Sequence, residues 1–130
     1  MPKTRCLEKL NEDDIQSAVV QYCDIKKIPI FSIPNAQRLS FLDRKKAVIA
    51  MVKLKKTGLK SGVPDLFIPM VKNGYSGMFL ELKTTKGRLT SSQKEWLGIL
   101  SANGYYAICC YSLDEAIIQI NQYLEKLKSE

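Results

Sequence analysis

The sequence predicts an α/β protein in which a central mixed β-sheet is flanked by helices. Segments with apolar residues at helical spacing alternate with short apolar runs rich in β-branched and aromatic residues, in the order α, β, α, β, β, α, β, α. Strand–helix–strand units favour parallel pairing, whereas two strands joined by a short turn favour an antiparallel hairpin. At a length of 130 residues, we expect a single domain spanning 1–130.

The N-terminal half predicts two helices that enclose a strand. The first helix, residues 12–26, follows the favourable N-cap Asn11, and its first-turn acids suit the positive end of the helix dipole. A strand is expected at 28–35 and a strongly basic helix at 42–56. We expect the apolar residues of this second helix to pack, in part against a second subunit: Val48, Ile49, Met51 and Val52.

The C-terminal half predicts a hairpin, a helix, a strand and a final helix, in the ranges 65–70, 78–83, 92–103, 105–111 and 114–128. Lys72 to Gly77 supplies the turn of the hairpin, and Gly104 ends the helix that follows it. The apolar side of the final helix is expected to comprise Ile117, Ile118, Ile120, Leu124 and Leu127.

The charge balance favours a polyanionic partner. Twenty Lys and Arg residues oppose thirteen Asp and Glu residues, giving a net charge of +7. Such an excess favours nucleic acid, although a basic protein without that partner has the same balance. The chain has no histidine, which excludes Ser-His-Asp and Cys-His nucleophile systems and histidine-metal nuclease sites. Hydrolytic chemistry would therefore depend on carboxylates, lysine or tyrosine.

The cysteines and the apolar runs indicate a cytoplasmic protein. Cys6, Cys23, Cys109 and Cys110 form no CxxC pair and do not have the spacing of a zinc site, so free thiols are expected. No segment approaches the ~20 apolar residues needed to span a membrane. The first residues lack the apolar core of a signal peptide.

Three residues near the hairpin carry the chemistry. Glu81 and Lys83 are two apart on one strand and therefore share a face, and pairing of the hairpin would bring Asp65 beside them. Two carboxylates among apolar neighbours need a cation, which Mg²⁺ or Mn²⁺ would supply. The main-chain carbonyl of Leu82 is a further candidate ligand. Lys83 would orient or deprotonate water, or stabilise the transition state.

Each part of this pattern also has a structural explanation. A Glu and a Lys two apart on a strand commonly form a solvated ion pair, and Pro64-Asp65 is common turn chemistry. Both parts in this order, on apolar strands joined by a short turn, are much less common.

As a set, these motifs resemble the VRR-NUC branch of the PD-(D/E)XK nuclease superfamily. The resemblance spans roughly residues 12 to 112 and comprises Glu12-x-x-Ile15-Gln16, Pro34-Asn35, Ser61-Gly62-Val63-Pro64-Asp65-Leu66, Glu81-Leu82-Lys83, Leu89-Thr90-x-x-Gln93-x-x-Trp96-Leu97 and Gly104-Tyr105. It implies a restriction-endonuclease-like core and metal-dependent phosphodiester hydrolysis on branched or structured DNA. Stand-alone members of this length resemble homodimeric Holliday-junction resolvases of phage or bacteria.

The resemblance also assigns roles. Asp65 and Glu81 become metal ligands, Lys83 the catalytic lysine, Glu12 a carboxylate that supports the metal, and Gln93 a contact near the metal or the scissile phosphate. Each of the last two has an alternative, because Glu12 also suits the helix dipole and Gln93 also suits an exposed helix position.

The expected DNA contacts are basic residues near the site. The place of the Val-Arg-Arg motif is held by Leu59-Lys60-Ser61, so Lys60 alone keeps its positive charge. Lys86 and Arg88 follow the catalytic strand, and Arg44 and Lys45 begin the basic helix, whose lysines are equally typical of a solvated face.

Three functions compete on this sequence. The first is a Mg²⁺- or Mn²⁺-dependent endonuclease that resolves four-way junctions as a homodimer, since two strands must be cut. The second is a nuclease of the same chemistry acting on flaps or ordinary duplex. The third is a nucleic-acid-binding subunit without catalysis, against which the intact Asp65, Glu81 and Lys83 argue.

Overall fold

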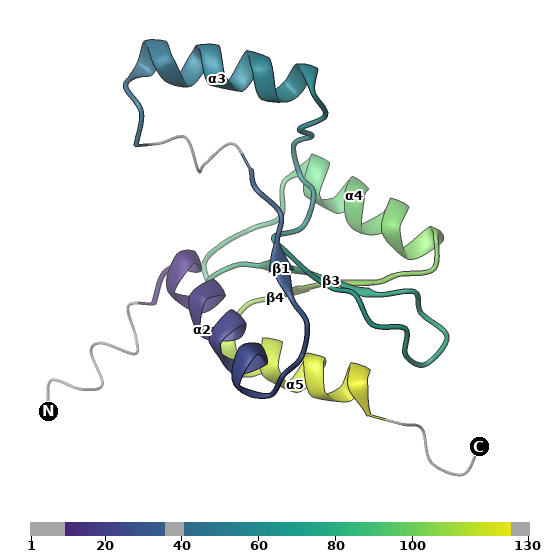
Figure 1. The fold of residues 1–130 in the computed structure, drawn as a ribbon. Coiled ribbons are helices and arrows are strands. Elements are labelled where there is room, and N and C mark those ends of the chain that lie inside the picture. The colour runs from purple at the N-terminus through teal and green to yellow at the C-terminus, as the bar shows by residue number, and fades with distance from the viewer. Residues whose placement is uncertain (1–9, 36–40, 126–130) are drawn as a thin grey trace, which may run out of the picture.

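The computed structural model describes residues 10–35 and 41–125, and in them the predicted order of helices and strands is confirmed (Figure 1). The elements are α2 (Glu12–Ile25), β1 (Phe31–Ser32), α3 (Arg44–Lys56), β2 (Leu66–Ile68), β3 (Met78–Leu82), α4 (Ser91–Ala102), β4 (Tyr106–Cys110) and α5 (Leu113–Leu124). Helices α2 and α5 lie on one side of the sheet and α4 on the other (Figure 1). The predicted mixed sheet flanked by helices is therefore present.

The sheet has the strand order β1-β2-β3-β4. β1 pairs with β2, and β2 with β3, in antiparallel fashion, which confirms the predicted hairpin. β3 and β4 are parallel, and α4 makes the crossover that parallel neighbours require. The register of the hairpin sets Leu66 opposite Leu80 and Phe67 opposite Phe79.

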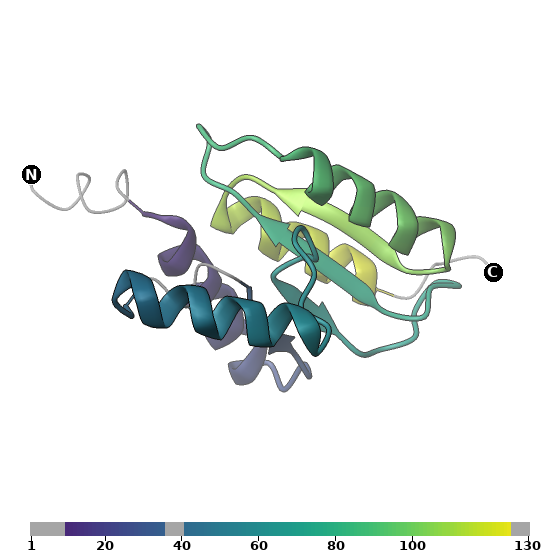
Figure 2. The same cartoon turned by 90° about the horizontal axis from the view of Figure 1, so that it is seen from above.

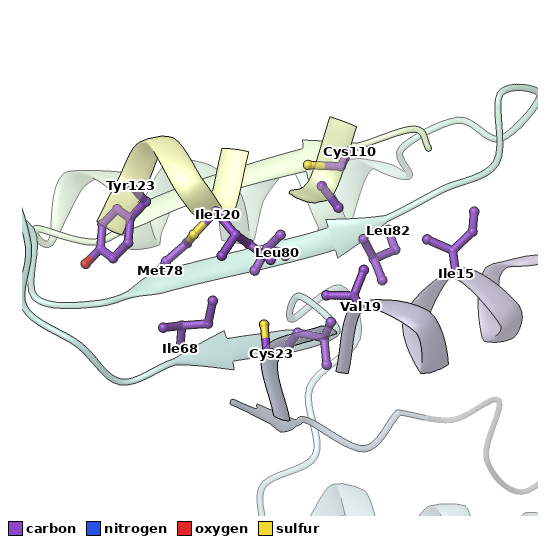
Figure 3. Close-up of a cluster of buried hydrophobic side chains, with 12 residues drawn as sticks. Ile15, Val19, Cys23, Ile68, Met78, Leu80, Leu82, Cys110, Ile120 and Tyr123 are labelled. Atoms are coloured by element: carbon purple, nitrogen blue, oxygen red, sulfur yellow. The ribbon is translucent and has the colours of Figure 1, made fainter. Parts of the chain in front are cut away.

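The core lies between the sheet and the helix pair α2 and α5 (Figure 3). Alternate side chains of β2 and β3 enter it, because successive residues of a strand point to opposite faces. The completely buried strand residues are Leu66, Ile68, Met78, Leu80 and Leu82. They meet Ile15, Val19 and Cys23 of α2 and Ala116, Ile120 and Tyr123 of α5.

Strand β1 is much shorter than the predicted 28–35. Only Phe31 and Ser32 pair with β2. Pro29 and Pro34 flank this pair, and a proline has no N–H to donate to a sheet ladder. The two prolines therefore limit the strand to its centre.

Helix α3 does not pack as predicted. None of its residues is buried, and Val48, Ile49 and Val52 are 56%, 61% and 62% exposed. The expectation that these side chains pack within the domain is wrong for Val48, Ile49 and Val52, since the helix stands away from the sheet (Figures 1 and 2). Only Ala47, Ala50 and Met51 of the helix are half-buried.

The apolar side of the final helix also differs from the prediction. Ile118 is 53% exposed, whereas Tyr123 is buried and occupies the core position. Tyr123 can be buried because its hydroxyl donates a 2.6 Å hydrogen bond to the carbonyl of Met70. The expected extension to residue 128 and the position of Leu127 lie outside the described residues.

The described cysteines, Cys23, Cys109 and Cys110, are free thiols. Cys110 faces the core and Cys109, its neighbour on β4, is paired in register with Glu81 of β3. Cys6 lies outside the described residues. Within the described ranges, no helix combines the length and apolar character needed to cross a bilayer.

Two isoleucines of α5 provide a test of this core. Replacing the fully buried Ile120 with Ala should lower the free energy of unfolding by about 2–5 kcal/mol, because it removes apolar contacts and leaves a cavity. The same change at the exposed Ile118 should cost less than about 1 kcal/mol. Urea unfolding of both variants measures the difference, and equal losses would contradict the assigned orientation of α5.

Candidate active site

A pocket of about 220 Å³ opens where β2 begins and β3 ends. Its walls come from the start of α2, the end of α3, the loop before β2 and the start of α4. Among its lining residues are all five predicted catalytic residues: Glu12, Asp65, Glu81, Lys83 and Gln93. Residues that are far apart in the sequence therefore meet at one end of the sheet.

The hairpin register places Asp65 beside Glu81. Leu66 pairs with Leu80, so the next pair along the antiparallel ladder is Asp65 and Glu81. The main chain fixes Asp65 further, because the N–H of Leu82 donates a 2.8 Å hydrogen bond to Asp65 Oδ2. Ile33 N–H donates to the Asp65 carbonyl at 2.8 Å and ties the same residue to the segment after β1.

Glu81 is a buried carboxyl with an incomplete set of partners. It is only 2% exposed and is the single charged residue in the buried set of the described chain. The side-chain amide of Gln93 donates to Glu81 Oε2 at 3.2 Å, while no described residue donates to Oε1. A buried carboxylate oxygen without a donor is costly, so this oxygen needs a proton or a cation.

The surroundings of Glu81 favour its protonated form when no cation is bound. Burial raises the pKa of the Glu81 carboxyl from its ordinary value of 4.5 to about 8. Asp65 adds to this rise in pKa through its negative charge and through a hydrogen bond between the two carboxyls, and the positive charge of Lys83 opposes it. Two adjacent carboxyls that resist ionising together are typical of a site prepared for positive charge.

Lys83 brings a positive charge to the same pocket as Asp65 and Glu81. Its side chain is only 12% exposed, and its Nζ lies 4.0 Å from Glu12 Oε2. Glu12 is the first residue of α2 and follows the capping residue Asn11, so it occupies the dipole position and also faces the pocket. Gln16, one turn later, lies instead beside a groove between α2 and β1.

Gln93 is held by the capping of α4. Thr90 is the N-cap, and its N–H donates to Gln93 Oε1 at 2.9 Å, while its hydroxyl accepts from the Gln93 N–H. This reciprocal capping box fixes the Gln93 amide, so that its NH₂ group points at Glu81. Gln93 is therefore not the exposed helix glutamine that the sequence left open.

A close backbone approach brings the loop of residues 57–64 to the same pocket. Gly62 has φ +92°, and a Cβ at this position would lie 2.5 Å from the carbonyl carbon of Ser92. Only glycine allows the loop to lie against the start of α4 at this distance. Lys60 and Ser61, which precede Gly62, consequently line the pocket.

The donors present suit a hard divalent cation. Asp65 and Glu81 offer adjacent carboxyl oxygens, and the buried Glu81 Oε1 has no donor among the described residues. The described residues contain no group of three Asp, Glu, Cys or His side chains placed to hold a metal. Mg²⁺ and Mn²⁺ fit such a set, because Mg²⁺ commonly binds one or two carboxylates and keeps several waters. The carbonyl of Leu82 stays a predicted ligand.

Four of the five predicted DNA contacts lie outside the pocket. Lys60 lines it, whereas Lys86 and Arg88 are exposed on the loop after β3. Arg44 and Lys45 are exposed at the first turn of α3.

The predicted site did not include two lining residues at the opposite end of α3, Met51 and Lys55, which the sequence placed only on the basic helix. Their helical spacing of four predicts a shared face, but nothing in the sequence tells which way that face points.

The raised pKa of Glu81 predicts a pH-dependent stability for the protein without a bound cation. Between about pH 4.5 and pH 8 the unfolded chain ionises this carboxyl while the folded chain keeps its proton. The unfolded state then binds fewer protons, so the free energy of unfolding should fall as pH rises through this window. Glu81→Gln should remove this part of the pH dependence, as urea unfolding in EDTA at pH 5 and pH 8 would show. Parallel pH curves for wild type and variant would contradict the assignment.

Comparison with known proteins shows the family of this chain. The family model of the VRR-NUC domain matches residues 10–114. The solved structure of a VRR-NUC domain protein matches with a TM-score of 0.73 and 28% sequence identity, over 88% of this chain and 88% of that chain. A search of curated proteins found no match. The mixed sheet and its helices are consistent with a restriction-endonuclease-like fold. The chain belongs to the VRR-NUC domain family, a family of nuclease domains.

Proposed function

We propose that the protein is a metal-dependent, structure-selective DNA endonuclease that uses Mg²⁺ or Mn²⁺. The observation that carries this proposal is the buried Glu81, which lies beside Asp65 with one carboxylate oxygen lacking a donor. Lys83 and Gln93 reach the same pocket from two different elements. A buried carboxyl with a raised pKa, lying beside a second carboxyl in a pocket, is a common mark of a functional site.

In this mechanism Asp65 and Glu81 would hold the cation, with Glu12 and the Leu82 carbonyl as further candidate ligands. When bound, the cation would lower the pKa of the attacking water and polarise the phosphate. Gln93 fixes one oxygen of Glu81 and so orients the other. Lys83, whose Nζ lies 4.0 Å from Glu12 Oε2, would orient the water or stabilise the charge that develops on the phosphate.

The charge distribution supports DNA as the substrate. The chain has a net charge of +7, and the buried charged residue of its described part, Glu81, is acidic, so the described basic residues are not buried. Lys60 at the pocket, with Lys86 and Arg88 after the catalytic strand, would contact phosphates on either side of the reacting one. Arg44 and Lys45 would extend this contact along α3.

The free thiols suit the cytoplasm of a bacterial or phage-infected cell.

The outer face of α3 favours a homodimer and hence a four-way junction. Val48, Ile49 and Val52 are three exposed aliphatic residues on neighbouring positions of one helical face. A symmetric pair of such helices would bury them, and a C2 dimer would present two active sites to a junction with two strands to cut. Resolution of Holliday junctions is therefore our preferred activity, with flap or duplex cleavage of the same chemistry as the alternative.

A cleavage assay tests the chemistry. Labelled four-way junction, flap and linear duplex are incubated with Mg²⁺, Mn²⁺ or EDTA. We expect cutting only with a divalent cation and fastest on the junction, and a loss of about 10²- to 10⁴-fold in Lys83→Ala. Lys72→Ala, at the far end of the same hairpin, is the matched control and should cut like wild type. Binding without metal-dependent cutting would instead favour the non-catalytic subunit, and equal cutting of all substrates would remove the junction preference.

Light scattering of the purified protein tests the dimer. We expect twice the chain mass for wild type and the single-chain mass for Val52→Asp, because the change buries a charge in the proposed interface. Ile118→Asp places the same charge at an exposed isoleucine of α5 and should leave the mass unchanged. A wild type of single-chain mass would rule out the interface.

A further inference from the structure

Helix α3 contributes one wall of the catalytic pocket through its last turns. Met51 and Lys55 line the pocket together with Asp65, Glu81 and Lys83. The helix carries six basic residues, and Lys55 is the one of them that reaches the pocket. In the view from above, α3 and α4 lie to either side of the strands that carry the carboxyl pair (Figure 2).

The helical period explains why Lys55 differs from its basic neighbours. Met51 and Lys55 are four apart and share a face, whereas Lys53 is offset by two residues, about 200° around the helix axis. Lys53 therefore points to the side away from the pocket. Lys53 and Lys55 have the same charge and the same exposed class, and both lie near the C-terminal end of α3, where a cation also suits the helix dipole.

The end of α3 directs a second cation to the same wall. Thr57 is the C-cap, and the chain reverses through Gly58 at φ +119°. The N–H of Leu59 donates to the Leu54 carbonyl at 2.9 Å and closes this turn over the helix end. Lys60 follows immediately and lines the pocket, so Lys55 and Lys60 face it from adjoining turns of chain.

Lys55 is not needed to neutralise the carboxylates of the pocket. Among the described residues, the ion pair in this pocket joins Lys83 to Glu12, and Lys55 forms none within 4.0 Å. The acidic groups line the pocket from the sheet and from the start of α2, while Lys55 lines it from α3 and is an exposed residue. A cation at that position matches the charge of a polyanionic strand that passes between α3 and the carboxyl groups.

We propose that α3 is one wall of the substrate groove and that Lys55 binds a phosphate of the nucleic-acid strand next to the one that is cut. This inference rests on the proposed nuclease function and extends it with a residue and a direction for the strand. Lys55 is a positioning residue, because its phosphate is not the reacting one. Such a contact is made equally in the ground state and in the transition state, so its loss should raise KM and leave kcat almost unchanged.

The test compares Lys55→Ala with Lys53→Ala, which removes the same charge from the other side of the helix. Binding of a labelled four-way junction is measured by fluorescence anisotropy in EDTA at several salt concentrations. Lys55→Ala should weaken binding about three- to tenfold and make the slope of log K against log salt shallower by about one unit, the share of one phosphate contact. Lys53→Ala should keep the slope of wild type, and Lys55→Arg should restore most of the affinity.

The cleavage assay supplies an independent readout. With a divalent cation, KM of Lys55→Ala should rise about three- to tenfold while kcat stays within about twofold of wild type. Thermal unfolding of each variant checks that the exposed substitutions leave the fold intact, and Lys55→Gln serves as a second variant that keeps a long polar side chain.

Failure of this inference can be told apart from failure of the nuclease proposal. If wild type cuts DNA but Lys55→Ala and Lys53→Ala change the salt slope equally, or not at all, the assignment of Lys55 is overturned and the nuclease function stands. A drop in kcat with unchanged KM would also overturn it, because Lys55 would then act on the reacting phosphate. If wild type binds DNA but never cuts it, the nuclease proposal fails, and the salt slopes still decide whether Lys55 contacts a phosphate.

Discussion

The burial of one carboxyl group organises this end of the molecule. Met78, Leu80 and Leu82 must face the core, and the alternation of a strand then sends Glu81 to the opposite face, where it is almost completely buried. A buried carboxyl is expensive to ionise, and the adjacent Asp65 increases the cost. The hydrophobic core thus sets the position of the Glu81 carboxyl, which is costly to ionise unless a cation lies beside it.

Several separate segments complete the surroundings of this group. The capping box of α4 orients Gln93, the close approach at Gly62 seats the loop before β2, and the first residue of α2 comes within 4.0 Å of Lys83. Each of these three features has its own local cause: the capping of α4, the positive φ of Gly62 and the start of α2. Together they surround the pocket with rigid elements, and rigid elements can fix the positions of the lining side chains even in a small domain.

Helix α3 has a different relation to the fold. It contributes no residue to the core, yet its Met51 and Lys55 line the pocket, and its Val48, Ile49 and Val52 are exposed. A helix with so little burial gains little stability from its own domain. The proposed substrate strand at Lys55 and the proposed second subunit at the exposed aliphatic residues would each give part of this helix a partner. On this view α3 couples assembly to substrate binding.

The sequence by itself determined the order of elements, the hairpin and the meeting of Asp65, Glu81 and Lys83 at one pocket, because strand alternation and a short turn are local properties. It also placed Glu12 and Gln93 among the candidates, through resemblance. The tertiary structure alone decided that Gln93 bridges the cap of α4 to Glu81, that α3 stands apart, and that Lys55 rather than Arg44 or Lys45 reaches the pocket. The direction in which a helix face points depends on contacts between distant segments, and no local pattern encodes it.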